Sequence, residues 1–301
     1  MAGDASFASV STLLHADVAP LVDKALVPKS YIAAGSAAVS GTSKFGAGSM
    51  SFSNSTSYFY TPHHADFDFG TGALTIECWF RATTIAGNTR AIFAKSSATS
   101  GIVREIALYL SSTTVVTFYY GVRGSSNVTK NFTVPVLAVD TWYHLAFTRD
   151  AAGDMRVFID GVQSSTGALN DATDLSGTLP IYFGALYAGA VFSPWDGYID
   201  DLRVTKGVAR YVTNFTAPTA PLIDGIAAVE GVVRDGAGTP AVRTVRLHDR
   251  DSGALIGAVQ SAAGTGAYAI YTPTVSEVQR IVLDDAPGIL LNDIIDRVIP
   301  A

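Results

Sequence analysis

The sequence is poor in cysteine and in charge, and each shortage excludes a class of protein. The 301 residues contain one cysteine, Cys78, so an internal disulfide cannot form. Charged residues make up 15% of the chain, against roughly a quarter in typical soluble proteins. The formal net charge is −6 and Lys and Arg form no basic run, which argues against a nucleic-acid-binding surface. Stability must therefore come from packing.

Long hydrophobic runs are also missing. No uninterrupted apolar stretch is long enough to cross a bilayer, and the amino terminus has no basic segment followed by an apolar one. We therefore expect neither membrane insertion nor a secretory route. Without secretion, the four Asn-x-Ser/Thr sequons are expected to be chance matches in a chain rich in Ser and Thr, at Asn54, Asn127, Asn131 and Asn214.

Glutamate is scarce as well, and most carboxylates are aspartates, which favour turns and disfavour helix interiors. No segment has the pattern of a long amphipathic helix. Short alternating segments follow one another instead, with turn residues between them, which predicts an all-β protein. The hydrophobic share of 48% in so weakly charged a chain favours a surface covered by partners, and so a homo-oligomer.

Two patterns are clear enough to assign faces. In L-T-I-E-C-W-F, the residues Leu74, Ile76, Cys78 and Phe80 alternate onto one side of a strand, so Cys78 is expected to be an inert buried thiol. The segments W-Y-H-L-A-F-T-R and M-R-V-F-I-D flank D-A-A-G-D and predict a hairpin. His144 lies on the first arm, where a packed structural role is favoured over a catalytic one.

The chain is expected to form two β domains, over residues 1–224 and 225–301. The segment N-F-T-A-P-T-A-P-L-I-D-G carries two prolines and marks the boundary. Before it, the strand G-Y-I-D-D-L-R-V-T places Asp200 on the face of Tyr198, Leu202 and Val204 by simple alternation. A carboxylate there must be satisfied by backbone amides, a cation or a metal. Asp201 is expected to pair with Arg203 on the opposite face.

Several segments between about Val10 and Leu222, in order along the chain, resemble a known family: K-F-G-A-G-S-M-S-F, L-T-I-E-C-W-F, W-Y-H-L-A-F-T-R-D, M-R-V-F-I-D-G and G-Y-I-D-D-L-R-V-T-K-G-V-A-R-Y. The family is the laminin-G-like branch of the concanavalin A-like lectin/glucanase superfamily. The resemblance implies a jelly-roll sandwich. Residues 226–301 resemble, less closely, a prealbumin-like or carboxypeptidase-regulatory β-sandwich module, so a small second sandwich is expected there.

The segment R-V-T-K-G-V-A-R-Y-V-T-N-F-T-A-P-T-A-P is similar to segments of domains found in bacteriophage virion and tail-associated proteins. The first expectation is therefore a non-enzymatic virion structural protein, assembled in the host cytoplasm with other virion proteins and contributing to host attachment. The alternative is a lectin-like module that binds a host-surface glycan. A glycan hydrolase is disfavoured, because retaining hydrolysis needs two carboxyl groups ~5 Å apart and no closely spaced acidic run is present.

Two sets of site residues follow. An aromatic platform for a glycan is expected from Tyr187, Phe192, Trp195 and Tyr198, beside a loop rich in small residues, with the alternative that Trp195 packs inside. No cofactor is required, but the resemblance implies a structural calcium held by Asp17 and Asp200 with backbone carbonyls.

Overall fold

The computed structural model describes residues 4–53, 56–85, 87, 89–96, 106–121, 127–187, 190–225, 227–235, 237–250, 252–272, 278–283, 293–298 and 300. It divides into two compact units, Ser9–Leu222, and Ile223–Ala301 together with Met1–Ala8. The division follows Leu222, two residues before the expected boundary. It also groups the first eight residues with the second unit, whereas the sequence placed them in the first domain.

The protein is built from β-strands, as expected. The described residues include two short 3₁₀ turns, η1 (Phe7–Ser9) and η2 (Ala65–Phe67), and no α-helix. Within that part of the chain no helix has the length and apolar character needed to cross a membrane.

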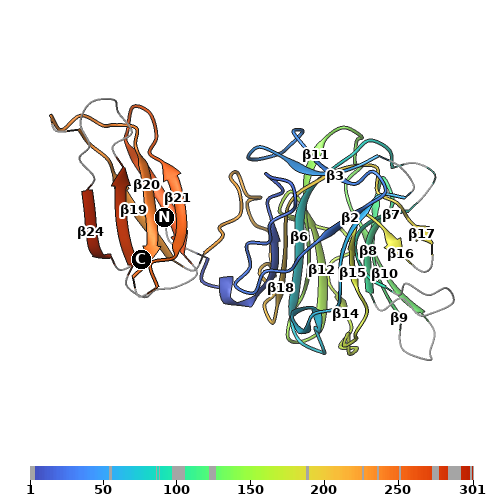
Figure 1. The fold of residues 1–301 in the computed structure, drawn as a ribbon. Helices are drawn as coiled ribbons and strands as arrows, with labels where there is room; N and C mark the ends of the chain where they lie inside the picture. Colours follow the sequence, from blue (N-terminus) through green and yellow to red (C-terminus); the bar gives the residue numbers. More distant parts are fainter. Residues whose placement is uncertain are drawn as a thin grey trace. The chain divides into compact units, whose positions relative to one another are not determined.

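The larger unit is a jelly-roll sandwich of two antiparallel sheets (Figure 1). One sheet has nine strands, in the order β13-β12-β11-β6-β18-β4-β3, with β1 beside β18 and β14 beside β12. Its strands are β1 (Val10–Leu14), β3 (Ala38–Ser40), β4 (Ser49–Phe52), β6 (Leu74–Ala82), β11 (Trp142–Arg149), β12 (Asp154–Ile159), β13 (Val162–Gln163), β14 (Leu169–Asn170) and β18 (Gly197–Lys206). The predicted hairpin is confirmed, because β11 pairs with β12.

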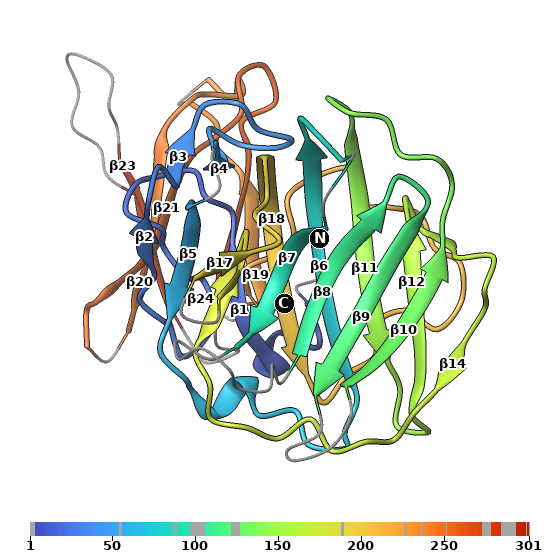
Figure 2. The same cartoon turned by 90° about the vertical axis from the view of Figure 1, so that its right-hand side faces the viewer.

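The second sheet of the sandwich has seven strands, in the order β10-β9-β8-β7-β15-β5-β2. Its strands are β2 (Ile32–Ala34), β5 (Tyr58–Thr61), β7 (Arg90–Lys95), β8 (Ile106–Ser112), β9 (Val115–Gly121), β10 (Asn127–Thr133) and β15 (Ile181–Phe183). A small hairpin of β16 (Leu186–Tyr187) and β17 (Val191–Phe192) follows β15, and Figure 2 shows β17 beside β7.

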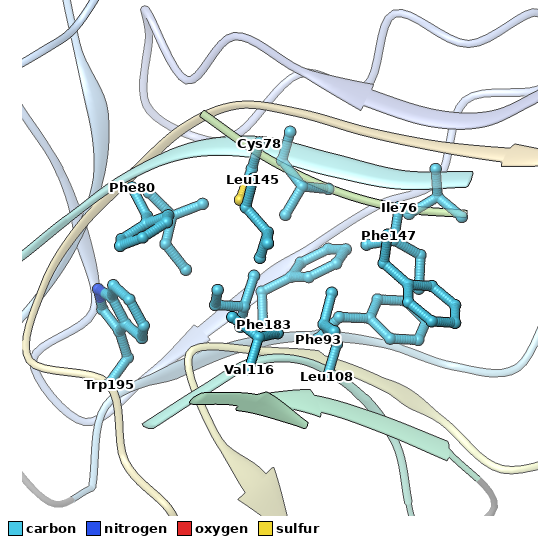
Figure 3. Close-up of a cluster of buried hydrophobic side chains, with 14 of the residues drawn as sticks. Ile76, Cys78, Phe80, Phe93, Leu108, Val116, Leu145, Phe147, Phe183 and Trp195 are labelled. Carbon is cyan, nitrogen blue, oxygen red and sulfur yellow. The ribbon is translucent and has the colours of Figure 1, made fainter. Parts of the chain in front are cut away.

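The core of this unit lies between the two sheets (Figure 3). Alternation in β6 places Cys78 and its same-face neighbours inside, as the sequence predicted, and the thiol is buried. The rings of Phe118 and Phe147 stack across the interface with centroids 4.2 Å apart. Burial of each such side chain stabilises the fold by roughly 1.5–3 kcal/mol. The labelled core residues are Ile76, Cys78, Phe80, Phe93, Leu108, Val116, Leu145, Phe147, Phe183 and Trp195.

A β-bulge in β18 changes the expected faces of the paired aspartates. Asp200 lies opposite Trp79 and Arg203 lies opposite Glu77, so β18 carries one extra residue between the two pairs. Asp201 takes up the bulge with a left-handed backbone, φ 49°. The prediction from simple alternation was therefore right in placing Asp200 on the face of Tyr198, but wrong in placing Leu202 and Val204 there and Arg203 on the opposite face. Leu202 and Val204 enter the core, whereas Asp200 and Arg203 both lie on the outer face.

The segment after β18, residues 207–222, crosses the outer face of the nine-stranded sheet, and we call it the strap. Its start is held at β6, where Thr75 Oγ1 donates to Val208 O at 2.9 Å. Further on, Thr148 Oγ1 donates to Tyr211 O at 2.9 Å and the Phe215 N–H donates to Gly161 O at 2.9 Å. The proline-rich stretch expected to be only an exit from the domain therefore also covers one of its sheets.

The smaller unit is a second β-sandwich. Its strands are β19 (Ala227–Val232), β20 (Thr244–Asp249), β21 (Leu255–Gln260), β22 (Ala267–Thr272), β23 (Val278–Leu283) and β24 (Asp293–Val298). β19 pairs with β22, and the other four form a sheet in the order β21-β20-β23-β24. A nonpolar cluster joins the two sheets, with Val229 and Ile270 from one and Val245 and Leu247 from the other. The expected fold class, a jelly roll followed by a small sandwich, is confirmed.

Candidate functional site

The outer face of the seven-stranded sheet collects tyrosines. In β5 the sequence Tyr58-Phe59-Tyr60 points the phenylalanine into the core and both tyrosines outward, since successive side chains of a strand alternate. β15 repeats the arrangement with Tyr182 outside and Phe183 inside. A phenol can keep its hydroxyl in water while its ring packs, which makes tyrosine the aromatic residue suited to such a face.

Four of these rings form what we call the tyrosine cluster: Tyr58, Tyr60, Tyr182 and Tyr187. Tyr182 stands between two rings, with centroids 5.9 Å from Tyr60 and 5.3 Å from Tyr187, both stacked. Tyr58 contacts all three at 5.4–6.0 Å in tilted or edge-on geometry. Tyr182 is buried in the middle, while the other three are half-buried and keep part of their side-chain surface accessible to solvent.

The cluster is one end of a row of side chains that crosses the sheet, which Figure 2 views from outside. Cross-strand pairing fixes its order from β10 to β2 as Thr129, Tyr119, Ala107, Ala94, Tyr182, Tyr60 and Ile32. The two alanines in the middle of the row are fully buried, in one cluster with the buried side chain of Leu186. Tyr109 is half-buried on the same face of β8, two residues after Ala107, and adds another aromatic ring to this face. The aromatic surface that this face presents is therefore made by its half-buried tyrosines, outside the buried centre of the row.

Neutral polar groups lie at the β10 end. Thr117 Oγ1 donates to Asn131 Oδ1 at 2.8 Å, and Ser111 Oγ also bonds to Thr117 Oγ1. Because the Thr117 hydroxyl donates its proton to Asn131, the Ser111 hydroxyl must be the donor in its hydrogen bond with Thr117. This chain orients the Asn131 amide with its oxygen toward the sheet and its NH₂ group outward. Asn131 is exposed, so that NH₂ group can donate to a ligand.

Two phenols of the cluster, those of Tyr58 and Tyr182, have a raised pKa. Burial, followed by the neighbouring Tyr187 and Tyr60 hydroxyls, raises the pKa of Tyr58. Burial, with a smaller contribution from the other phenols of the cluster, raises the pKa of Tyr182 to about 12. A protonated phenol both donates and accepts a hydrogen bond. Rings and paired donors and acceptors are the groups that bind the C–H faces and hydroxyls of a sugar.

The four residues expected to form a platform do not come together. Tyr187 belongs to the tyrosine cluster, and Phe192, 44% exposed, lies in the hairpin strand paired with its own. Trp195 has no exposed surface and packs edge-on against Phe80 at 5.6 Å, so its membership of a platform was wrong and the packed alternative is what the fold adopts. Tyr198 lies on the other sheet, where its ring is 6.4 Å from that of Trp142.

Five tyrosines of this face were not predicted from the sequence as site residues: Tyr58, Tyr60, Tyr109, Tyr119 and Tyr182. A local signal was present, because Tyr and Phe alternate in Y-F-Y and I-Y-F, which separates a polar aromatic face from a core face. The pairing of β15 with β5 and β7 was not readable from the sequence. These strands are far apart along the chain.

Asp17 and Asp200 hold one loop, residues 44–48, through its backbone. Asp200 Oδ2 accepts the N–H groups of Lys44 and Phe45 at 2.7 and 3.1 Å, and Asp17 Oδ1 accepts those of Ala47 and Gly48 at 2.5 and 3.2 Å. Burial, reinforced by Asp201, outweighs these amide bonds and raises the pKa of Asp200 to about 6.

This geometry favours the amide alternative for Asp200 over the metal. Calcium takes six to eight oxygen ligands, and the groups aimed at these carboxylates are N–H donors. Among the described residues, no group of three or more His, Cys, Asp and Glu side chains is placed to hold a metal ion. The calcium remains a prediction, and an unchanged melting temperature in excess chelator would count against it.

The outer face of the nine-stranded sheet buries a charged network under the strap. Glu77 Oε1 accepts from Arg203 Nε and lies 2.8 Å from Nη2, and Tyr211 donates to Oε2 at 2.8 Å. His144 Nε2 lies 3.4 Å from Oε2, and its ring is fully buried, in line with the structural role predicted for it. Arg203 therefore pairs with Glu77, and its predicted pairing with Asp201 was wrong.

Asp201 has other partners. One of its oxygens contacts His15 Nδ1, and the other accepts the Leu222 N–H at 2.7 Å, where the strap ends.

Glu77 is enclosed by an arginine, a tyrosine and a histidine. A carboxylate neutralised in this way and shielded from solvent is not available as a glycosidase acid or nucleophile.

The chain matches a known protein family. The sequence profile described as the concanavalin A-like lectin/glucanases superfamily matches residues 53–209, more than half of the chain. The chain belongs to this superfamily. The matched region runs from the strands of the tyrosine cluster to the start of the strap. A comparison with curated protein sequences gives no significant match.

Solved structures of similar fold include members with binding roles. Domain 4 of AbnA, a GH43 extracellular arabinanase from Geobacillus stearothermophilus, was solved in complex with arabinotriose. It is 18% identical, with a TM-score of 0.50 over 67% of this chain and 94% of that one. The binding domain of Paraclostridial Mosquitocidal Protein 1 is 12% identical, with a TM-score of 0.53 over 96% of this chain and 76% of that one.

A third similar structure is that of botulinum neurotoxin type C, whose cell entry depends on interaction with two ganglioside molecules. It is 11% identical, with a TM-score of 0.50 over 96% of this chain and 71% of that one. The TM-scores show that these proteins share a fold with this chain. At identities this low the similarity shows the fold alone, so the ligand has to be argued from the residues of this chain.

Proposed function

We propose that this protein is a non-catalytic carbohydrate-binding protein, and that the half-buried rings of the tyrosine cluster form the binding site. The observation that carries the proposal is the gathering of half-buried tyrosines from β5, β16 and β8 on one sheet face, beside outward-facing amide and hydroxyl groups. Such a face offers flat rings for stacking and neutral hydrogen-bonding groups for hydroxyls. The arabinotriose bound to the arabinanase domain and the gangliosides named for the neurotoxin support the same class of ligand.

The rings are also held in place before a ligand arrives. Tyr182 is fixed by stacking on both faces, and the Tyr187 N–H donates to Ser96 Oγ at 3.2 Å. Side chains that are already ordered lose less conformational entropy on binding, which favours affinity.

A glycan array probed with the full chain tests the proposal, followed by calorimetric titration of the strongest carbohydrate. Tyr60→Ala and Tyr187→Ala should each weaken binding at least about fivefold, since aromatic residues at the centre of an interface commonly contribute more than 1 kcal/mol. Tyr198→Ala is the matched control, because it removes a half-buried tyrosine from the opposite sheet.

The outcomes separate clearly. Binding that is lost in Tyr60→Ala and Tyr187→Ala but kept in Tyr198→Ala supports the tyrosine cluster as the site. Equal losses in all three variants, or an array with no signal together with no binding to host cells, would contradict it. Circular dichroism of each variant checks that the fold is intact.

For its biological setting, we propose that the protein is a tail-associated or surface component of a bacteriophage virion. The support is the sequence resemblance of residues 203–221 to virion proteins and the low share of charged residues, which suits a homo-oligomer packed among other virion proteins. The second sandwich would then be a prealbumin-like accessory module. Mass spectrometry of purified virions tests this setting, and absence of the chain from them would reject it.

A further inference from the structure

We infer that the outer face of the nine-stranded sheet carries a second binding site, for a carbohydrate that bears a carboxylate group, as a uronic acid or a sialic acid does. The site is made by Lys44, Arg81, Trp142 and Tyr198. It lies on the opposite sheet from the tyrosine cluster, so the inference adds a site to the proposed function and does not depend on the first one.

Three of these residues form a row across the sheet. The register of β11, β6 and β18 places Trp142, Arg81 and Tyr198 side by side. On each strand a neighbouring residue packs on the core side, so alternation directs the row outward. All three side chains are half-buried and keep part of their surface accessible to solvent. A ligand in solution can therefore reach this row.

The two rings of the row converge over the arginine between them. Trp142 and Tyr198 are on strands separated by β6, which puts their backbones about 9.6 Å apart. Their ring centroids are nevertheless only 6.4 Å apart, at an interplanar angle of 45°. The guanidinium carbon of Arg81 lies 5.6 Å from the centroid of the Tyr198 ring. The row therefore offers aromatic surface for the nonpolar face of a sugar ring beside a planar cation.

Lys44 brings a second cation to the row. Its Nζ lies 3.9 Å from the centre of the Trp79 ring, and Trp79 precedes Arg81 by two residues on the same face of β6, about 7 Å along the strand. Among the described residues the Lys44 side chain has no carboxylate partner, and it contacts only the rings of Phe45 and Trp79. The Lys44 N–H donates to Asp200, which holds the backbone in place. The ammonium group is therefore positioned beside the row with its charge uncompensated.

A carboxylate is the anionic group that suits this arginine. Arg81 Nη2 donates to Asp140 Oδ1 at 3.1 Å, so the guanidinium edge already meets a carboxylate in this fold. The Asp140 side chain is 56% exposed, and ion pairs exposed to this degree are weak. A ligand carboxylate can take the place of Asp140, form two parallel hydrogen bonds with the guanidinium and gain the attraction of Lys44.

The test uses an array of carbohydrates that carry a uronic acid, a sialic acid or sulfate, together with neutral counterparts. The carboxylate-bearing member with the strongest signal is then titrated calorimetrically against the full chain at low and high salt. We expect the affinity to fall at least about threefold at high salt, because charges at the surface are screened. The comparison of uronic and sialic acids shows which source of the carboxylate the site accepts.

Variants of single charges test the placement. Arg81→Gln should weaken this ligand at least about tenfold, since hydrogen bonds to a charged group are lost, and Lys44→Gln about threefold. Lys206→Gln is the matched control, because it removes the same charge from the far end of β18 and should leave the affinity unchanged. Asp140→Asn should strengthen binding about twofold to fivefold, since the carboxylate that competes for Arg81 is gone. Misfolding cannot produce such a gain.

The outcomes separate the two sites. Tyr198→Ala should weaken the carboxylate-bearing ligand at least about fivefold and leave a ligand of the tyrosine cluster unaffected. An array on which no carboxylate-bearing carbohydrate binds, or on which sulfated members bind more tightly, overturns the inference. Loss of the ligand in Tyr60→Ala with no loss in Arg81→Gln also overturns it, while the proposed function stands. Weaker binding in Asp140→Asn would show that Asp140 does not compete with the ligand and would overturn the placement of the carboxylate.

Discussion

Replacement of Glu77 by glutamine should lower the free energy of unfolding of the jelly-roll unit by more than so small a chemical change implies. The carboxylate is fully buried, and its Oε1 lies 2.8 Å from both Nε and Nη2 of Arg203, which is itself only 5% exposed. Burial alone would raise the pKa of Glu77, but Arg203, followed by His144 and Arg210, outweighs it and holds the pKa well below its ordinary value. The negative charge is therefore what compensates the buried guanidinium.

The magnitude follows from what is left behind. Glutamine fills the same space but has only one acceptor oxygen, so it can accept from Arg203 or from Tyr211 and turns an NH₂ group toward the other; the loss is that of charge compensation for Arg203 together with one acceptor. Removing one partner of a buried ion pair typically costs about 3–5 kcal/mol. In a unit of this size each kcal/mol lowers the melting temperature by about 2–4 °C, so we expect a decrease of about 6–20 °C.

Urea unfolding followed by tryptophan fluorescence measures this selectively. All three tryptophans, Trp79, Trp142 and Trp195, lie in the unit Ser9–Leu222, so their signal reports that unit alone. Asp140→Asn is the matched control. It breaks the Arg81–Asp140 pair of 3.1 Å, whose aspartate is 56% exposed, and should cost less than about 1 kcal/mol.

A double variant separates charge from packing. Glu77→Met combined with Arg203→Met removes both charges and should be more stable than Glu77→Gln alone, because paired buried charges can often be replaced by nonpolar side chains without loss. A cost below about 1 kcal/mol for Glu77→Gln would refute the reasoning. It would mean that Arg203 is solvated or paired in some other way.

Three further predictions concern other parts of the jelly roll. Gly184→Ala should destabilise it strongly, by several kcal/mol on thermal melting, because the residue has φ 80° and a Cβ would lie 2.1 Å from the Phe52 ring; a loss below 1 kcal/mol would contradict this. The folded-state pKa of Asp200, about 6, exceeds its unfolded value of 3.8, so its contribution to stability falls as pH rises from about 4 to about 6. The stability of Asp200→Asn relative to the natural protein should therefore improve by about 2–3 kcal/mol between pH 4 and pH 7, and a difference that is flat with pH would show the carboxylate to be ionised throughout. Cys78, whose pKa is raised by burial, should react with a thiol reagent only upon unfolding, and rapid labelling of the folded protein would disprove its burial.

Prediction from the sequence succeeded where the evidence was local. Alternation assigned the faces of β6 and of the β11–β12 hairpin, because one side of each strand is nonpolar and the period of two leaves little choice. It failed at Asp201, where a single bulged residue shifts the register. Alternation cannot reveal a bulge whose extra residue is as polar as its neighbour, so Leu202 and Arg203 were assigned to the wrong partners.

The candidate site shows a similar division. The aromatic residues of the 187–198 region were predicted to form one platform, but only Tyr187 joins the tyrosine cluster, and Trp195 fills the core. The partners of Tyr187 come from strands that precede it by up to 129 residues, as the numbering of Tyr58 and Tyr187 shows. No short-range pattern links them.

The sequence by itself determined the β composition, the inward side of the long strands, the burial of Cys78 and His144, and the family to which the chain belongs. The first three depend on side-chain polarity and on spacing along one strand, whereas the family was predicted from the resemblance of several segments to known members. The tertiary structure alone decided which tyrosines share a face, that the strap encloses Glu77 with Arg203, and that the carboxylates of Asp17 and Asp200 hold the same loop. The physical reason is that each depends on which distant strands are hydrogen-bonded neighbours, and strand order is set by the packing of the whole sandwich.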